Sequence, residues 1–92
     1  MQDEITAWFR GRVPDGWFTA PVEVVVDRDE IVVLGTLSPP GLDGLTDDQV
    51  PVALEARTAG FREDTRERRV QIAAEAEHRF ERKVAWGVRC GG

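Results

Sequence analysis

The sequence FREDTRERRVQIAAEAEHRFERKVAWGV, which forms residues 61–88, decides the fold. Residues 61–82 contain neither glycine nor proline and are rich in Ala, Glu, Gln and Arg, so they predict a long helix. Directly after this helix, alternation places Val84, Trp86 and Val88 on one face of a strand. A long helix that leads straight into a strand indicates a mixed helix and sheet domain.

Two β-branched segments precede this helix and predict a hairpin. They are residues 22–26 and 30–37, and the polar residues 27–30 lie between them. Both faces of the second segment are apolar, so we expect it to be the central strand of the sheet.

Two shorter helices are also expected. Residues 3–10 have acidic side chains in their first turn and stop at Gly11. Residues 47–57 follow a capping box that begins at Thr46. Pro51 blocks one backbone hydrogen bond there, which leaves a shorter or partly extended element open.

The chain therefore predicts one small domain over residues 1–92, with a flexible end at residues 90–92. The predicted fold class is α+β, in which a three-stranded sheet carries helices packed on one face. The expected element order is α-β-β-α-α-β.

Charge is divided unevenly along the chain. Residues 1–56 carry three Arg against eleven Asp and Glu, whereas residues 57–92 carry nine Arg and Lys against six Asp and Glu. The net charge of -5 hides this division. Arg outnumbers Lys by eleven to one, a bias that indicates a GC-rich bacterial source and weakens the case for a selected arginine surface. The division itself is the compositional hint of a charged partner.

The basic charge gathers on one face of the long helix. The apolar stripe that contains Ile72, Ala76 and Phe80 faces the core, and arginines continue it toward the amino terminus. These arginines, which we call the arginine face, are Arg62, Arg66 and Arg69. They are the predicted binding residues.

The arginine face has three interpretations at the level of sequence. In the first it is solvated, and nearby charges form exposed helix ion pairs. The expected pairs are Glu63 with Arg66, Asp64 with Arg68, and Glu75 with Arg79. In the second it binds phosphate or carboxylate groups of an RNA or an acidic protein. In the third it docks onto another copy, whose acidic cluster is Asp43, Asp47 and Asp48.

No enzyme or metal motif accompanies this face. His78 has no second histidine or cysteine at ligand spacing, and Cys90 has only Arg89 beside it. We expect no catalytic residue, metal or cofactor, with an enzyme lacking a recognisable motif as the contrasting alternative. The short apolar runs and the acidic start predict a cytoplasmic protein without a membrane span.

The element order and the stretch AEHRFERKVAWGV, residues 76–88, resemble the end of a type II KH domain, over residues 30–89 in all. The KH family binds single-stranded nucleic acid through a G-x-x-G loop between two helices. The matching residues 60–63 read GFRE and keep only the first glycine, so the resemblance is to a degenerate KH-like domain. The alternative function that this resemblance implies is a degenerate KH-like domain that acts only in protein contacts or homo-oligomerisation. We expect a small non-enzymatic binding module whose arginine face contacts an acidic protein or RNA.

Overall fold

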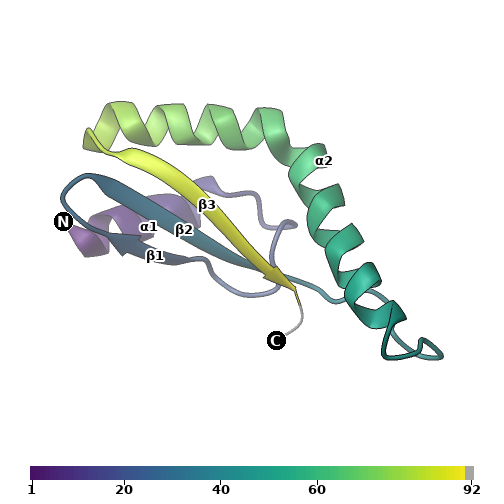
Figure 1. The fold of residues 1–92 in the computed structure, drawn as a ribbon. Helices are drawn as coiled ribbons and strands as arrows, with labels where there is room; N and C mark the ends of the chain where they lie inside the picture. Colours follow the sequence, from purple (N-terminus) through teal and green to yellow (C-terminus); the bar gives the residue numbers. More distant parts are fainter. Residues whose placement is uncertain (91–92) are drawn as a thin grey trace.

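The structure is a computed structural model and describes residues 1–90. Within these residues it forms two helices and three strands in the order α-β-β-α-β (Figure 1). The helices are α1 (Gln2–Arg12) and α2 (Gln49–Phe80). The strands are β1 (Glu23–Val26), β2 (Glu30–Leu37) and β3 (Lys83–Cys90). The predicted α+β class with a three-stranded sheet is confirmed.

The strands lie in the order β1-β2-β3, so β2 is central as its two apolar faces predicted. β1 pairs with β2 antiparallel as the expected hairpin. β3 pairs with β2 in parallel, with Glu30 opposite Lys83 at one end and Leu37 opposite Cys90 at the other. Asp27 closes the hairpin because its Oδ1 accepts the backbone N–H groups of Asp29 and Glu30, each at 2.8 Å.

Both helices pack on one face of this sheet, as predicted. Alternate strand residues point to opposite faces, and on β2 every second residue is buried. Trp8 of α1 meets Phe80 of α2 edge to face, with ring centroids 5.9 Å apart. The buried core cluster is Ile5, Phe9, Val13, Val22, Val24, Ile31, Val33, Ile72, Ala76 and Phe80.

Helix α1 runs through Gly11, where the sequence predicted its end, and stops one residue later at Arg12. The residue before a proline is disfavoured in the helical region, and Val13 precedes Pro14. Val13 accordingly adopts an extended backbone with φ -70° and ψ 132°. The following loop packs inward through Trp17, whose ring centroid lies 6.2 Å from that of Trp86 on β3.

The largest difference from the prediction is that the two expected helices, 47–57 and 61–82, are one continuous helix α2. Gly60 does not interrupt it, and residues 60–63 form no loop. Pro51 lies in the first turn, where backbone N–H groups have no partner within a helix, so its missing donor costs nothing there. The expected capping box is half formed, because Gln49 Oε1 accepts the Thr46 N–H at 2.9 Å, but the N-cap residue is Asp48, which makes no side-chain cap hydrogen bond.

Helix α2 bends near its middle, so that its second part lies over the sheet and its first part leads away from it (Figure 1). The Thr65 hydroxyl donates to the Phe61 carbonyl at 2.6 Å, a back-bond to the preceding turn that bends helices. Gly60 lies in the same region of the sequence. A glycine within a helix destabilises it, because its backbone loses more conformational freedom on folding than that of other residues.

Helix α2 ends at Phe80, two residues before the predicted end, because Glu81 adopts the left-handed conformation with φ 56°. β3 then begins at Lys83 and extends through Cys90. The prediction of a flexible end at residues 90–92 is therefore wrong for Cys90, which pairs with Leu37. Residues 91–92 of that prediction lie outside the described residues.

Candidate functional site

The structure places the arginine face on the part of α2 next to the bend. Arg62, Arg66 and Arg69 follow one another at spacings of four and three residues, which sets them on one flank of a helix. Arg62 and Arg66 are exposed, and Arg69 is half-buried beside the core stripe. The helix rise of ~1.5 Å per residue makes the face about 10 Å long.

Arg69 is held in place by the helix itself. Its Nε donates to Thr65 Oγ1 at 2.9 Å, and its Nη2 donates to the Arg62 carbonyl oxygen at 2.7 Å. Thr65 is a buried polar residue, and its hydroxyl donates in turn to Phe61. The guanidinium therefore has a fixed position without the help of a carboxylate.

The electrostatics of Arg69 show that positive charge is concentrated here. Burial lowers the pKa of Arg69 from its ordinary value, and the positive charges of Arg62 and then Arg66 lower it further. Each of these causes opposes the charged form. An anion bound at this face would relieve the repulsion.

Acidic side chains compensate the arginine face only in part. Arg66 pairs with Glu63 at 2.8 Å, as predicted, and both side chains are well exposed. Across residues 1–90, no Asp or Glu oxygen lies within 4.0 Å of a guanidinium nitrogen of Arg62 or Arg69. Two of the three arginines are thus without a carboxylate partner in the described part of the chain.

The other two expected helix ion pairs are not formed among the described residues. Glu75 instead binds Arg12 of α1 with two hydrogen bonds, Nε to Oε1 at 2.7 Å and Nη2 to Oε2 at 3.0 Å. Arg79 pairs with Glu4 of α1, with its Nη2 3.6 Å from Glu4 Oε2. The prediction of a Glu75–Arg79 pair is wrong because α1 brings closer partners, and sequence spacing within one helix does not reveal them.

The acidic cluster lies before the start of α2, away from the arginine face. Asp43, Asp47 and Asp48 are exposed and precede the helix. Thirteen residues separate Gln49 from Arg62, which is about 20 Å along a helix. The cluster and the face therefore do not compensate each other within one molecule.

The remaining candidate residues stand apart. His78 is exposed on α2, and Cys90 Sγ lies 3.7 Å from the Ser38 carbonyl oxygen. Within residues 1–90, no group of three or more His, Cys, Asp or Glu side chains is arranged to hold a metal ion. Neither described helix has a run long and apolar enough to cross a membrane.

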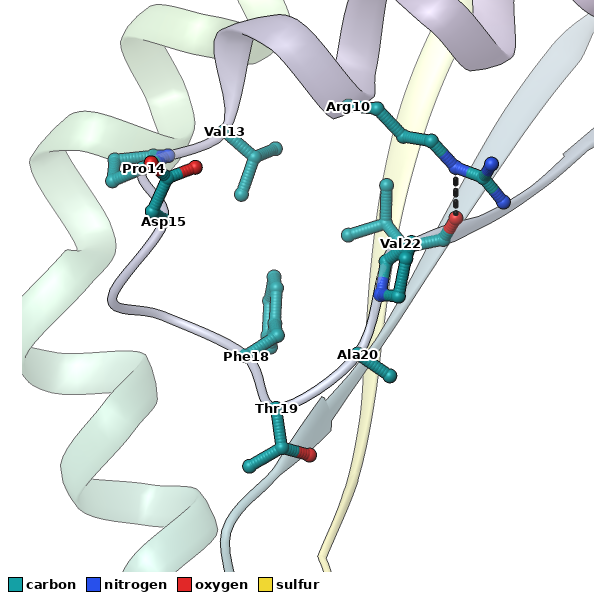
Figure 2. A pocket seen from close by; sticks show the side chains of 9 residues that line it. Arg10, Val13, Pro14, Asp15, Phe18, Thr19, Ala20 and Val22 are labelled. Atoms are coloured by element: carbon teal, nitrogen blue, oxygen red, sulfur yellow. Dashed lines mark hydrogen bonds between the residues drawn. The ribbon is translucent and has the colours of Figure 1, made fainter.

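One cavity was not predicted from the sequence. It has a volume of about 330 Å³ and lies between the end of α1 and the loop before β1 (Figure 2). Val13, Phe18 and Val22 give it apolar walls. The Arg10 guanidinium is turned toward the Val22 carbonyl, to which its Nε donates at 3.3 Å. Its two charged lining residues, Arg10 and Asp15, come from a helix end and a turn, which show no periodic signal in sequence.

These features define a small α+β domain with a mixed three-stranded sheet and a basic face on its long helix. The chain belongs to the Rv1265-like family, because the model described as Rv1265-like protein, N-terminal domain, matches residues 3–92.

Its relatives include the uncharacterised proteins Rv1265 of Mycobacterium tuberculosis and Mb1296 of Mycobacterium bovis. Each is 46% identical over 85 residues, which cover 92% of this chain and 36% of the relative. The chain thus spans about a third of the length of these relatives. They are bacterial, in agreement with the arginine bias of the sequence. No solved structure gave a significant match.

Proposed function

We propose that this domain is a non-enzymatic binding module whose arginine face contacts an acidic partner. The observation that carries the proposal is the position of Arg69, which is fixed to the helix beside two like charges. A guanidinium held in place loses little side-chain freedom on binding, so more of the interaction energy appears as affinity. Arg62 and Arg66, which are exposed, supply further donors.

An acidic protein segment is the partner that the surroundings of this face favour. Glu63 stays bound to Arg66, and Asp64 and Glu67 are exposed on the same part of α2. A continuous phosphate backbone would meet these carboxylates as well as the arginines, whereas a short peptide can present its carboxylates to the arginines alone. The sequence pI of about 4.8 gives the domain a net negative charge, which repels RNA, with one phosphate at every nucleotide, more strongly than a short peptide with a few carboxylates. RNA is therefore the second partner to test.

The test compares two triple variants that lose the same charge. One replaces Arg62, Arg66 and Arg69 by Ala. The matched control replaces three exposed arginines elsewhere by Ala, namely Arg28, Arg68 and Arg79. Fluorescence anisotropy is measured with a labelled peptide rich in Glu and Asp, and with a labelled single-stranded RNA.

We expect the arginine-face variant to bind the acidic peptide at least ten times more weakly, and the control to change less than about threefold. Equal losses in both variants would show that only net charge matters and would refute the site. Tighter binding of RNA than of peptide would replace the protein partner by RNA. Because Arg69 is half-buried, a variant with only Arg62 and Arg66 replaced keeps the test valid if the triple variant loses stability.

Thr65 offers a separate test of how Arg69 is positioned. Thr65→Val keeps the shape of the side chain and removes the hydroxyl that accepts the Arg69 Nε–H. We expect weaker peptide binding with a faster dissociation rate, while Thr65→Ser retains the wild-type rate because it keeps the hydroxyl. Identical kinetics in the Val and Ser variants would contradict a positioning role.

A further inference from the structure

The sheet has a second face that no described helix covers. Because side chains alternate along a strand, the residues between the core positions point to this side. We call it the open face. It consists of Glu23 and Val25 on β1, Glu30, Val32, Leu34 and Thr36 on β2, and Lys83, Ala85, Gly87 and Arg89 on β3.

The centre of the open face is apolar. Val25, Val32 and Ala85 stand side by side across the three strands. Val25 is 56% exposed, and Val32 and Ala85 are partly exposed. Leu34 leans toward β3, since a Cβ on Gly87 would come within 2.6 Å of Leu34 Cδ2. Parallel strands are normally covered on both faces, so it is unusual for an apolar second face over the β2–β3 pair to be exposed to solvent.

The two edges of the open face carry opposite charge. Glu23 lies on the β1 edge, and Lys83 and Arg89 lie on the β3 edge. Within one molecule Arg89 Nη2 pairs with Glu23 Oε2, and both side chains are still more than half exposed. The two edges also differ in side-chain size, because Val25 on β1 is larger than Ala85 on β3.

This pattern is complementary to itself. A two-fold axis parallel to β2, placed between two stacked open faces, sets β1 of one copy over β3 of the other. Glu23 then lies over the edge that carries the other copy's Arg89, and Val25 lies over the other copy's Ala85. Val32, on the central strand, packs near the axis against its own counterpart.

We propose that the open face is a docking surface for a second copy of this chain, giving a two-layer sandwich of two three-stranded sheets. Such sandwiches pack with the mean strand directions of their two sheets within about 30° of each other. The footprint of three strands, at ~4.8 Å spacing and about five residues each, covers about 250 Å² per copy. That is about a third of a standard interface, so the dimer is weak, with a dissociation constant in the sub-millimolar range.

One like-charge contact accompanies this arrangement. Glu30 lies at the hairpin end of β2, near the axis, and faces Glu30 of the second copy. Asp27, beside the same end, has its carboxylate engaged by the turn and lies toward the β3 edge of the second copy, where Lys83 offsets it. The Glu30 contact predicts that Glu30→Gln strengthens the dimer several-fold.

The test is sedimentation equilibrium of the chain from about 10 μM to about 1 mM. The apparent mass should rise from 10.3 kDa toward twice that value, less steeply in high salt. Val32→Glu should remain monomeric throughout, with a wild-type circular dichroism spectrum. Replacing Arg62, Arg66 and Arg69 by Ala should leave the association unchanged, which separates this surface from the arginine face.

A pair of charge reversals makes the test specific for the second copy. Glu23→Arg gives two basic edges and Arg89→Glu gives two acidic edges, so neither variant should associate with itself. Mixed in equal amounts they should form a heterodimer, because each basic edge then lies over an acidic one. Both variants lose the internal Glu23–Arg89 pair equally, so internal destabilisation does not produce this result.

Three outcomes would overturn the proposal. The first is a wild-type chain that is monomeric at every concentration, which would assign the open face to another occupant. The second is a Val32→Glu variant that associates like wild type. The third is a mixture of Glu23→Arg and Arg89→Glu that does not associate.

Discussion

Gly35 lies where Phe18, in the loop before β1, packs against the sheet, and replacing Gly35 by Ala tests how that contact supports α2. Gly35 is buried on the core face of β2. A Cβ at this position would overlap Cδ1, Cε1 and Cζ of the Phe18 ring. The Phe18 ring is itself packed 5.3 Å from the ring centroid of Phe61, the neighbour of the arginine face on α2. The ring has to move, and its contact with α2 has to loosen.

The expected cost follows from these contacts. Overpacking a core position costs about 1–3 kcal/mol, and a disturbed aromatic pair costs ~1 kcal/mol more. Ala has less conformational entropy than Gly in the unfolded chain, which offsets about 0.5–1 kcal/mol of this cost. We expect Gly35→Ala to lower the free energy of unfolding by about 2 kcal/mol, which for a domain of this size lowers the melting temperature by roughly 10 °C.

Urea unfolding followed by tryptophan fluorescence measures this effect. Gly41→Ala is the matched control, because a Cβ there has nothing within 4 Å, and it should change stability by less than about 0.5 kcal/mol. In a Phe18→Ala background the ring is absent, so Gly35→Ala should cost almost nothing. An equal cost in both backgrounds would refute the clash with Phe18 as the cause.

Three further predictions concern the helices. Gly60→Ala should stabilise the fold by about 0.5–1 kcal/mol in thermal unfolding, since Gly60 lies within α2 and a Cβ there meets nothing within 4 Å. Destabilisation would show that the bend needs glycine. Glu81→Gly should also stabilise, by ~1 kcal/mol, because φ 56° strains any residue with a Cβ; Glu81→Ala should not. The hydrogen bond from Arg12 lowers the pKa of Glu75, so this pair stabilises the fold above the ordinary Glu pKa and the contribution is lost as pH falls through the lowered pKa. Unfolding of wild type and Glu75→Gln should therefore differ at pH 7 and converge in acid once the pH is below the lowered pKa, and a constant difference would contradict the pair.

Much of the sheet could be predicted because its signals are local. Residues 22–26 and 30–37 are β-branched and joined by a polar turn, and the second segment is apolar on both faces, which marked it as central. The strand after the long helix was equally clear from the alternation of Val84, Trp86 and Val88. Each of these signals depends on neighbours within a few residues, and the structure confirms all three elements.

Helix boundaries were predicted less well because they depend on groups outside the helix. Gly11 was interpreted as the end of a helix and Gly60 as part of a loop between two helices, yet both lie within helices whose other residues favour the helical state. Glu81 carries no sequence signal for the left-handed conformation that ends α2.

The candidate site shows the same limit. The shared flank of Arg62, Arg66 and Arg69 follows from helical spacing, but the anchoring of Arg69 by Thr65 does not. The one available signal was a threonine on the core-facing arc of the helix, four residues before an arginine. The pairing of Arg12 with Glu75 joins residues 63 positions apart, and only the folded chain reveals it.

The parallel pairing of β2 with β3 has a consequence for how quickly the chain folds. Glu30 and Lys83 lie opposite each other in the paired strands but are 53 residues apart in sequence. All the remaining residue pairs between β2 and β3 have the same separation. The hairpin of β1 and β2 closes a short loop, whereas the third strand joins only after a long segment has been ordered. Folding should therefore proceed in milliseconds or longer rather than in microseconds, with the docking of β3 as the late, rate-limiting event.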